Sequence, residues 1–191
     1  GVQAQTEKLF HVCKKRGIPI FTFVNKMDRP AREPVDLLDQ LEKVLGIRAT
    51  PATWPIGNGA SFEGVYDRRT KEVHLFERVR KGADVAGLTV VKADDPRLAD
   101  VVESSALAQM REDVALVDGA MPDFDVEEIR AGRLTPVFFG SAMTNFGVEL
   151  FLKAVLELAP PPSPRRAATA IVDPAADGFS GFIFKIQANM N

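Results

Sequence analysis

The chain has 191 residues, of which 46% are hydrophobic and 26% are charged, and its formal net charge is −2. This balance is typical of a soluble globular protein and excludes a disordered chain. The longest apolar run, residues 18–24, is far shorter than the roughly 20 residues of a membrane span, and the scattered basic residues mark no nucleic-acid site. The single cysteine, Cys13, cannot form an internal disulfide, so we expect a cytoplasmic protein.

The first 50 residues predict a helix, a strand and a second helix. Apolar residues recur at helical spacing over residues 2–13, and a basic cluster followed by Gly17 suits the end of a helix. Residues 18–24 are rich in β-branched and aromatic types, which predicts a strand buried on both faces of a parallel sheet. Residues 34–45 predict the second helix. Its buried stripe is expected to comprise Val35, Leu38, Leu41 and Leu45.

The alternation of helix and strand breaks after this point. Strand patterns occupy residues 52–56, 62–66 and 72–76. The last two predict a hairpin around a polar turn, and we expect Trp54 and Tyr66 to pack within these strands. A long helix is predicted from Asp95 towards Leu116, and a shorter one follows over residues 126–131.

Residues 135–139 predict another buried strand, and the helix after it is expected to bury one apolar stripe. That stripe comprises Val148, Leu152, Val155 and Leu156. Residues 159–166 contain four prolines and predict a stiff connector, because proline continues neither a helix nor a central strand. Beyond it, residues 179–186 alternate between apolar and polar types, as the opening strand of a separate β domain would.

The tetrapeptide Asn25, Lys26, Met27, Asp28 follows the first predicted strand, at the edge where open α/β sheets place their ligands. An Asp carboxylate can accept hydrogen bonds from N1 and the N2 amine of guanine, whereas adenine lacks that amine. We therefore expect Asp28 to select guanine and Asn25 to hold the base edge and the neighbouring loops. The aliphatic stem of Lys26 is expected to cover one face of the ring. The alternative is a chance tetrapeptide in a surface turn.

A second short loop follows the other buried strand. Gly140, Ser141 and Ala142 offer backbone N–H groups, and their small side chains let the loop approach guanine O6. Alone, this tripeptide indicates only an ordinary turn between a strand and a helix. Two such loops at strand ends together predict a pocket for a guanine base, so the expected cofactor is GTP or GDP.

Asn-Lys-x-Asp followed by Gly-Ser-Ala resembles the pair of guanine-recognition motifs in the P-loop GTPases. Asp28 and Gly140 lie 112 positions apart (140 − 28), far more than the helix and strand that separate these motifs in small GTPases. The chain is therefore similar to the translational GTPases that carry an inserted subdomain. The matching segments are residues 54–66, 135–151, 160–165 and 178–190. The last of them resembles the termination factors of that family more than its translocation factors.

The resemblance implies an α/β fold: the C-terminal part of a P-loop GTPase domain with a mostly parallel sheet, an inserted α+β subdomain, and the start of a β-barrel domain. The implied parts are residues 1–50 and 134–159 for the GTPase domain, 51–133 for the inserted subdomain, 160–177 for a Pro-rich linker and 178–191 for the β-barrel domain. The resemblance also implies that the chain is an internal fragment of a longer protein.

In that family the nucleotide state governs docking on the ribosome. The resemblance implies a GTP-binding, GTP-hydrolysing termination factor that promotes the release and recycling of class I release factors. The expected partners are the ribosome and class I release factors, with no membrane. Two alternatives stay open: a translocation GTPase similar to elongation factor G, and a noncatalytic module that binds the ribosome through the inserted subdomain.

The family's phosphate loop, Mg²⁺ ligands and hydrolytic segment are expected upstream of Gly1. The resemblance therefore implies no catalytic residue and no metal ligand among these residues, and little GTP hydrolysis by the chain alone. His11 and His74 lack the sequence context of the family's water-positioning histidine, so we assign neither of them that role.

Overall fold

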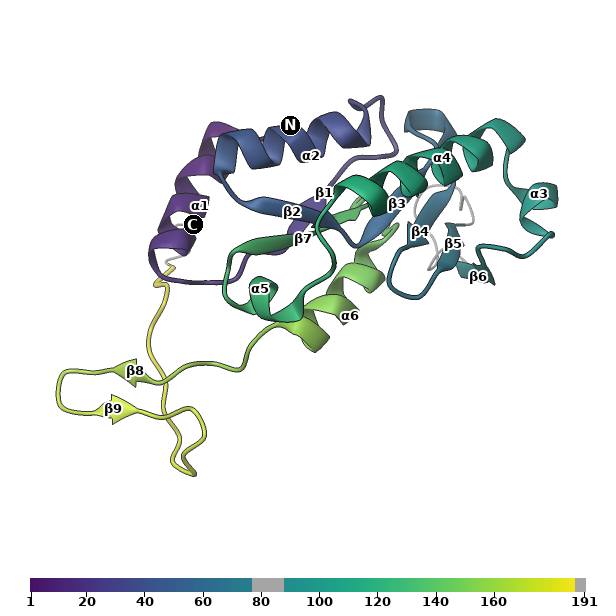
Figure 1. The fold of residues 1–191 in the computed structure, drawn as a ribbon. Helices are drawn as coiled ribbons and strands as arrows, with labels where there is room; N and C mark the ends of the chain where they lie inside the picture. The colour runs from purple at the N-terminus through teal and green to yellow at the C-terminus, as the bar shows by residue number, and fades with distance from the viewer. Residues whose placement is uncertain (77–87, 188–191) are drawn as a thin grey trace, which may run out of the picture. The chain divides into compact units, whose positions relative to one another are not determined.

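The structure, a computed structural model, describes residues 1–76 and 88–187 (Figure 1). It divides into two units, Gly1–Ala159 and Pro160–Asn191. The first unit combines a parallel sheet, an antiparallel sheet and helices, which confirms the predicted α/β class. Within the described residues, no helix is long and apolar enough to cross a membrane.

The parallel sheet has three strands, with β7 (Leu134–Phe139) between β1 (Thr22–Val24) and β2 (Arg48–Pro51). All six residues of β7 are buried, as predicted for this strand. β1 is shorter than the apolar run that predicted it, and it is only half-buried. The expectation of burial on both faces was wrong, because β1 is an edge strand of the sheet that the structure describes. β2 was not predicted, since Arg48 and Pro51 interrupt its apolar pattern.

Helices cover both faces of this sheet (Figure 1). α1 (Ala4–Lys15) and α2 (Pro34–Leu45) bury Phe10 and several leucines in the same cluster as Val137 and Phe139 of β7. Phe138 joins the cluster of α6 (Val148–Leu158), because successive side chains of a strand point to opposite faces. α2 has its predicted bounds and ends at Gly46, which takes the left-handed conformation with φ 62°.

The buried stripes of α2 and α6 differ from those predicted. In α2, Leu37 is buried and Val35 is exposed. In α6, the side chains of Leu152 and Leu156 are 53% and 85% exposed, and Phe151 packs towards the sheet together with Ala154 and Leu158. α6 carries apolar residues on more than one face, so spacing alone does not choose among them. The face that holds Phe151 is turned towards the sheet because the ring of Phe151 packs against that of Phe138, with the centroids 5.4 Å apart.

The antiparallel sheet has the order β3 (Thr53–Ile56), β4 (Gly64–Asp67), β5 (Glu72–Phe76), β6 (Leu88–Lys92). The hairpin of β4 and β5 confirms the prediction, whereas β6 was not predicted. Trp54 and Tyr66 are buried, as expected. The indole Nε1 of Trp54 donates a hydrogen bond of 3.1 Å to Oδ2 of Asp113 on α4 (Ser104–Ala120), which joins the sheet to that helix.

The long helix predicted from Asp95 is two helices, α3 (Leu98–Val101) and α4. The break lies at Val102, whose backbone is extended with φ −114° and ψ 139°. Val102 is buried in the core, and β-branched residues have low helix propensity. Burying this side chain therefore interrupts the helix at this position.

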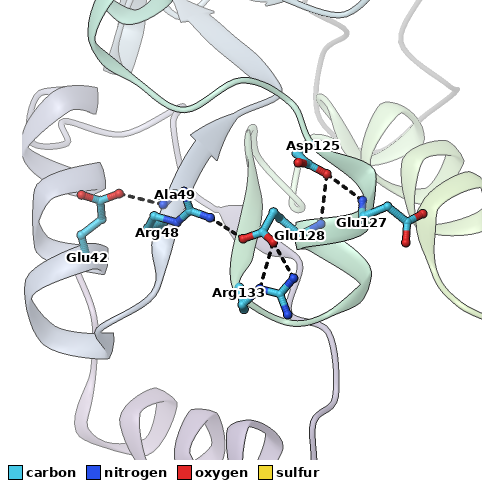
Figure 2. Close-up of polar contacts among 7 residues, drawn as sticks. All are labelled: Glu42, Arg48, Ala49, Asp125, Glu127, Glu128 and Arg133. Atoms are coloured by element: carbon cyan, nitrogen blue, oxygen red, sulfur yellow. Dashed lines mark hydrogen bonds and ion pairs between the residues drawn. The ribbon is translucent and has the colours of Figure 1, made fainter.

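A polar cluster fastens α5 (Val126–Arg130) to the parallel sheet (Figure 2). Oδ1 of Asp125 accepts hydrogen bonds from the backbone N–H groups of Glu127 and Glu128, which caps the start of the helix. The carboxylate of Glu128 pairs with Arg48 on β2 and with Arg133 before β7. Hydrogen bonding from Arg133 lowers the pKa of Glu128.

The second unit contains a two-residue antiparallel ladder between β8 (Arg165–Arg166) and β9 (Ile171–Val172). Within the connector predicted over residues 159–166, residues 160–164 form neither helix nor strand, as their prolines predict, whereas Arg165 and Arg166 form β8. The strand predicted over residues 179–186 is not formed, because no strand in the described part of this unit pairs with it, and Phe179, Phe182 and Phe184 are exposed. The end of the predicted β-barrel segment, residues 188–191, lies outside the described residues.

Candidate guanine-nucleotide site

Two loops leave the same edge of the parallel sheet. In the parallel pairing of β1 with β7, Val24 lies opposite Phe139, so the first loop (residues 25–31) and the second loop (residues 140–146) start side by side. The backbone N–H of Gly140 donates to the carbonyl oxygen of Val24, and the N–H of Met27 donates to that of Gly140, each at 3.0 Å. The sheet ladder thus continues into the two loops.

The side chain of Asn25 ties the loops together. Its Oδ1 accepts hydrogen bonds from the backbone N–H of Ala142 at 2.9 Å and of Lys26 at 2.8 Å. Lys26 has φ 71°, a left-handed conformation that costs non-glycine residues about 1–2 kcal/mol. The bond from Lys26 to Asn25 helps to hold that conformation. The Nδ2 group of Asn25 has no partner among the described residues and is free to donate.

Lys26 and Asp28 present charged groups at the surface of the first loop. Lys26 is exposed and Asp28 is half-buried, whereas Met27 between them is fully buried and anchors the loop. Within the described part of the chain, neither charged side chain forms a hydrogen bond or ion pair with another residue. An unpaired carboxylate at the edge of a loop is free to accept two hydrogen bonds from a ligand.

The second loop turns sharply within a few residues. The backbone groups of Ser141 and Phe146 exchange two hydrogen bonds of 2.9 Å. A Cβ atom on Gly140 would lie 2.2 Å from the carbonyl oxygen of Phe146 and 2.8 Å from the ring of Phe23, so no other residue fits there without a shift. Oγ of Ser141 is buried and has no hydrogen-bond partner in the described structure. A buried hydroxyl without a partner costs about 1–3 kcal/mol, which a bound ligand or water would relieve.

The structure brings together the six residues that the sequence singles out: Asn25, Lys26, Asp28, Gly140, Ser141 and Ala142. One expectation about them was wrong. The backbone N–H groups of Gly140, Ser141 and Ala142 are not free for a base. They donate to Val24, to Phe146 and to the side chain of Asn25. The cause is the continued ladder together with the amide of Asn25, neither of which local sequence reveals.

Three further residues of this region were not predicted. Asn58 and Gly59 belong to the insert loop (residues 57–61) after β3, and both contact the first loop. Phe146 closes the turn of the second loop. The only sequence signal at the insert loop is an asparagine between two glycines, which indicates a tight turn without saying what it contacts.

Comparison with known proteins identifies the family. The family model described as the elongation factor Tu GTP binding domain matches residues 1–161. The chain belongs to this GTP-binding domain family. The predicted resemblance to translational GTPases is thereby confirmed.

Two curated relatives of this chain show more specifically which members of the family it resembles. The peptide chain release factor 3 of Gloeobacter violaceus is 53% identical over 191 residues, which is 100% of this chain and 36% of that protein. The peptide chain release factor 3 of Synechococcus elongatus is also 53% identical over 191 residues, covering 100% of this chain and 34% of that protein. The chain spans about a third of the length of the curated relatives it matches. Their names agree with the predicted resemblance to termination factors.

A solved structure shares the fold. A crystal structure of a protein from Thermus thermophilus matches with a TM-score of 0.57 and 23% identity, covering 85% of this chain and 25% of that chain. At this identity the likeness concerns the fold alone.

Proposed function

We propose that this chain is the guanine-reading part of a GTP-binding, GTP-hydrolysing translation termination factor. The observation that carries the proposal is the pair of loops at adjacent ends of parallel strands, tied by Oδ1 of Asn25, with the carboxylate of Asp28 left unpaired among the described residues. Placing ligands at the carboxyl ends of the strands is the general rule for open α/β sheets.

The side chains of the first loop fit a guanine base. The carboxylate of Asp28 accepts the two N–H donors of guanine, N1–H and the N2 amine. Nδ2 of Asn25 donates to an acceptor on the base edge while its Oδ1 keeps holding Ala142. The stem of Lys26 covers one face of the ring.

The second loop contributes shape and buried polar groups to the same pocket. The residues at 140–142 have small side chains or none, and Oγ of Ser141 is a buried polar group in need of a partner. Since Ala142 donates to Oδ1 of Asn25, its N–H is not available to guanine O6 in this arrangement.

The parts of the chain follow from the same proposal. Residues 1–50 and 134–159 form the GTPase domain and 51–133 the inserted subdomain, which β3 to β6 with α3 and α4 support. β2, which pairs with β7, lies at the first of these boundaries. Residues 160–177 act as a linker, and residues 178–191 open the β-barrel domain.

In the whole protein, bound GTP supplies the phosphoanhydride bond that is hydrolysed. We assign the phosphate and Mg²⁺ ligands and the hydrolytic residues to positions outside these 191 residues, so the chain alone hydrolyses little GTP. The nucleotide state governs docking of the full-length protein on the ribosome in the cytoplasm. There it promotes the release and recycling of class I release factors, as the names of the curated relatives favour over translocation.

The test is a titration of the full-length protein with fluorescently labelled GDP, competed by unlabelled GDP, GTP and ADP. The expected result is displacement by both guanine nucleotides and none by ADP at the same concentration. Equal displacement by ADP would reject the guanine site. A ribosome assay then decides the role: accelerated turnover of a class I release factor supports termination, and translocation activity without it supports an elongation factor.

A further inference from the structure

The insert loop contacts the first loop on both sides of Asp28. The side-chain amide of Asn58 pairs with the backbone of Ala31: Oδ1 accepts from its N–H at 3.2 Å, and Nδ2 donates to its carbonyl oxygen at 3.0 Å. The backbone N–H of Gly59 donates to the carbonyl oxygen of Met27 at 2.9 Å. Asp28 therefore lies between two points at which its loop is attached to the insert loop.

Two glycines give the insert loop its conformation. Gly57 and Gly59 have φ values of 76° and 61°, in the left-handed region that favours glycine. A Cβ atom on Gly59 would lie 3.2 Å from the backbone nitrogen of Pro30, which shows how closely the two loops approach each other. The close approach lets the backbone of Gly59 and the short side chain of Asn58 reach the first loop.

The antiparallel sheet of β3 to β6, from which the insert loop extends, also holds the second loop through aromatic packing. The ring of Phe146 stacks on that of Phe76 at the end of β5, with centroids 4.6 Å apart and planes at 12°. The ring of Phe62, directly after the insert loop, lies 6.2 Å from the ring of Phe146. Because the backbone of Phe146 exchanges two hydrogen bonds with Ser141, this packing fixes the turn that carries Ser141.

We propose that the antiparallel sheet positions both guanine-reading loops, and that Asn58 is the positioning residue that holds the loop of Asp28. The proposal rests on the proposed guanine site. Asn58 acts through Ala31 and touches no base. Its loss therefore loosens the placement of Asp28 and leaves the preference for guanine, which the carboxylate itself determines, unchanged.

The size of the effect follows from the two hydrogen bonds that Asn58 makes to Ala31. Each typically contributes enough for a severalfold change in an equilibrium constant, so losing both should weaken GDP binding about tenfold. The change should come mostly from faster dissociation, because substitutions that weaken a binding site usually alter the off-rate more than the on-rate.

The chain offers a matched control in the same turn. Oγ of Ser61 donates to the carbonyl oxygen of Asn58 at 2.9 Å and accepts from its N–H at 3.2 Å. Ser61→Ala thus disturbs the insert loop without removing a bond to Ala31. Asn58→Asp is a conservative variant, because a carboxylate keeps the acceptor for the N–H of Ala31 and loses the donor.

The experiment uses the full-length protein and measures GDP dissociation together with amide hydrogen exchange of residues 26–32 without nucleotide. Asn58→Ala should release GDP about tenfold faster and speed the amide exchange of this segment. The ratio of the affinities for GDP and for xanthosine diphosphate (XDP) should stay unchanged. Asn58→Asp should give an intermediate change, and Ser61→Ala should stay within about twofold of the wild type.

Unchanged exchange in Asn58→Ala, or an equal effect of Ser61→Ala on exchange, would overturn the proposal whichever nucleotide binds. The exchange measurement needs no ligand, so it separates this outcome from a failure of the guanine site itself. That failure would show as a wild-type protein that does not distinguish GDP from ADP.

Discussion

Asn25 joins two loops that are 117 positions apart in the chain, because its Oδ1 accepts a hydrogen bond from the backbone N–H of Ala142 at 2.9 Å. The same oxygen accepts from Lys26, whose left-handed backbone is thereby held. One side-chain oxygen thus shapes the first loop and sets its distance from the second. In an open α/β sheet these loops lie at the ligand-binding edge, so this contact is central to the proposed site.

Replacing Asn25 tests this contact directly. Asn25→Ala removes the acceptor for two backbone donors, so we expect about 1–3 kcal/mol less stability in urea unfolding of the full-length protein. Guanine-nucleotide affinity should fall as well. Asn25→Asp keeps an acceptor at the same place and should retain most of the stability while losing the Nδ2 donor. Equal stability of Asn25→Ala and the wild type would show that the inter-loop bond contributes nothing.

Gly140 is expected to tolerate no side chain. Gly140→Ala places a Cβ atom 2.2 Å from the carbonyl oxygen of Phe146, so the second loop must shift. We expect a loss of at least about 2 kcal/mol in stability, comparable to other overpacked sites. The matched control is Gly119→Ala on α4, where a Cβ atom meets nothing within 4 Å. Alanine raises helix propensity there, so this variant should gain up to about 1 kcal/mol. Similar behaviour of the two variants in thermal unfolding would contradict this account.

Arg68 connects three elements and should matter for stability. Its guanidinium donates to Oδ1 of Asp118 on α4 and to the carbonyl oxygen of Pro51 at 2.7 Å, and its side chain is only 13% exposed. Arg68→Ala leaves that carbonyl without its donor, so we expect a loss of about 2 kcal/mol in urea unfolding. Lys43→Ala is the control. It removes an exposed ion pair with Asp39 and should cost less than about 0.5 kcal/mol. Equal losses would show that burial of the arginine is unimportant.

His74 should make the stability of this unit depend on pH. Its pKa is lowered from 6.5 by burial, against the opposing effects of the nearby Asp67, Glu72 and Glu149, while Lys153 lowers it further. The unfolded chain therefore binds more protons than the folded chain at pH values between the lowered pKa and about 6.5. Stability from this group is fully present above pH 6.5 and declines as the pH falls through this window.

The variant His74→Leu removes that titration and places an apolar side chain of similar size in the same buried position. Urea unfolding at about pH 7.5, 6.5 and 5.5 should show a smaller decline for the variant than for the wild type. The buried ring nitrogens have no partner among the described residues, so the variant should not be less stable at the highest pH. Parallel pH profiles of the two proteins would show that His74 does not titrate on unfolding.

Sequence patterns predict the elements of this chain better than their packing. The buried strand β7 and helix α2 were predicted closely, because a continuous apolar run and a proline at a helix start are strong local signals. The break at Val102 and the buried face of α6 were missed, since both depend on which side chain fits the core. Such choices are made by tertiary contacts that no local pattern contains.

In the candidate site, too, sequence patterns predict the local motifs better than the contacts between distant segments. Its six predicted residues come from short motifs at strand ends, and parallel pairing of β1 with β7 brings them together. The contacts of Asn58 with Ala31 join residues 27 positions apart, and those of Phe146 with Phe76 depend on the antiparallel sheet. Local spacing carries no signal for either contact, which explains why both residues were missed.

The most direct test of the guanine site is the base preference of the full-length protein with Asp28→Asn. Asparagine can donate a hydrogen bond to the extra carbonyl oxygen of xanthine, where the carboxylate accepted from the amine of guanine. We predict that the variant binds XDP more tightly than GDP, while the wild type prefers GDP by about a hundredfold or more. A variant that keeps the wild-type preference for GDP would remove Asp28 from the base pocket and contradict the proposed function.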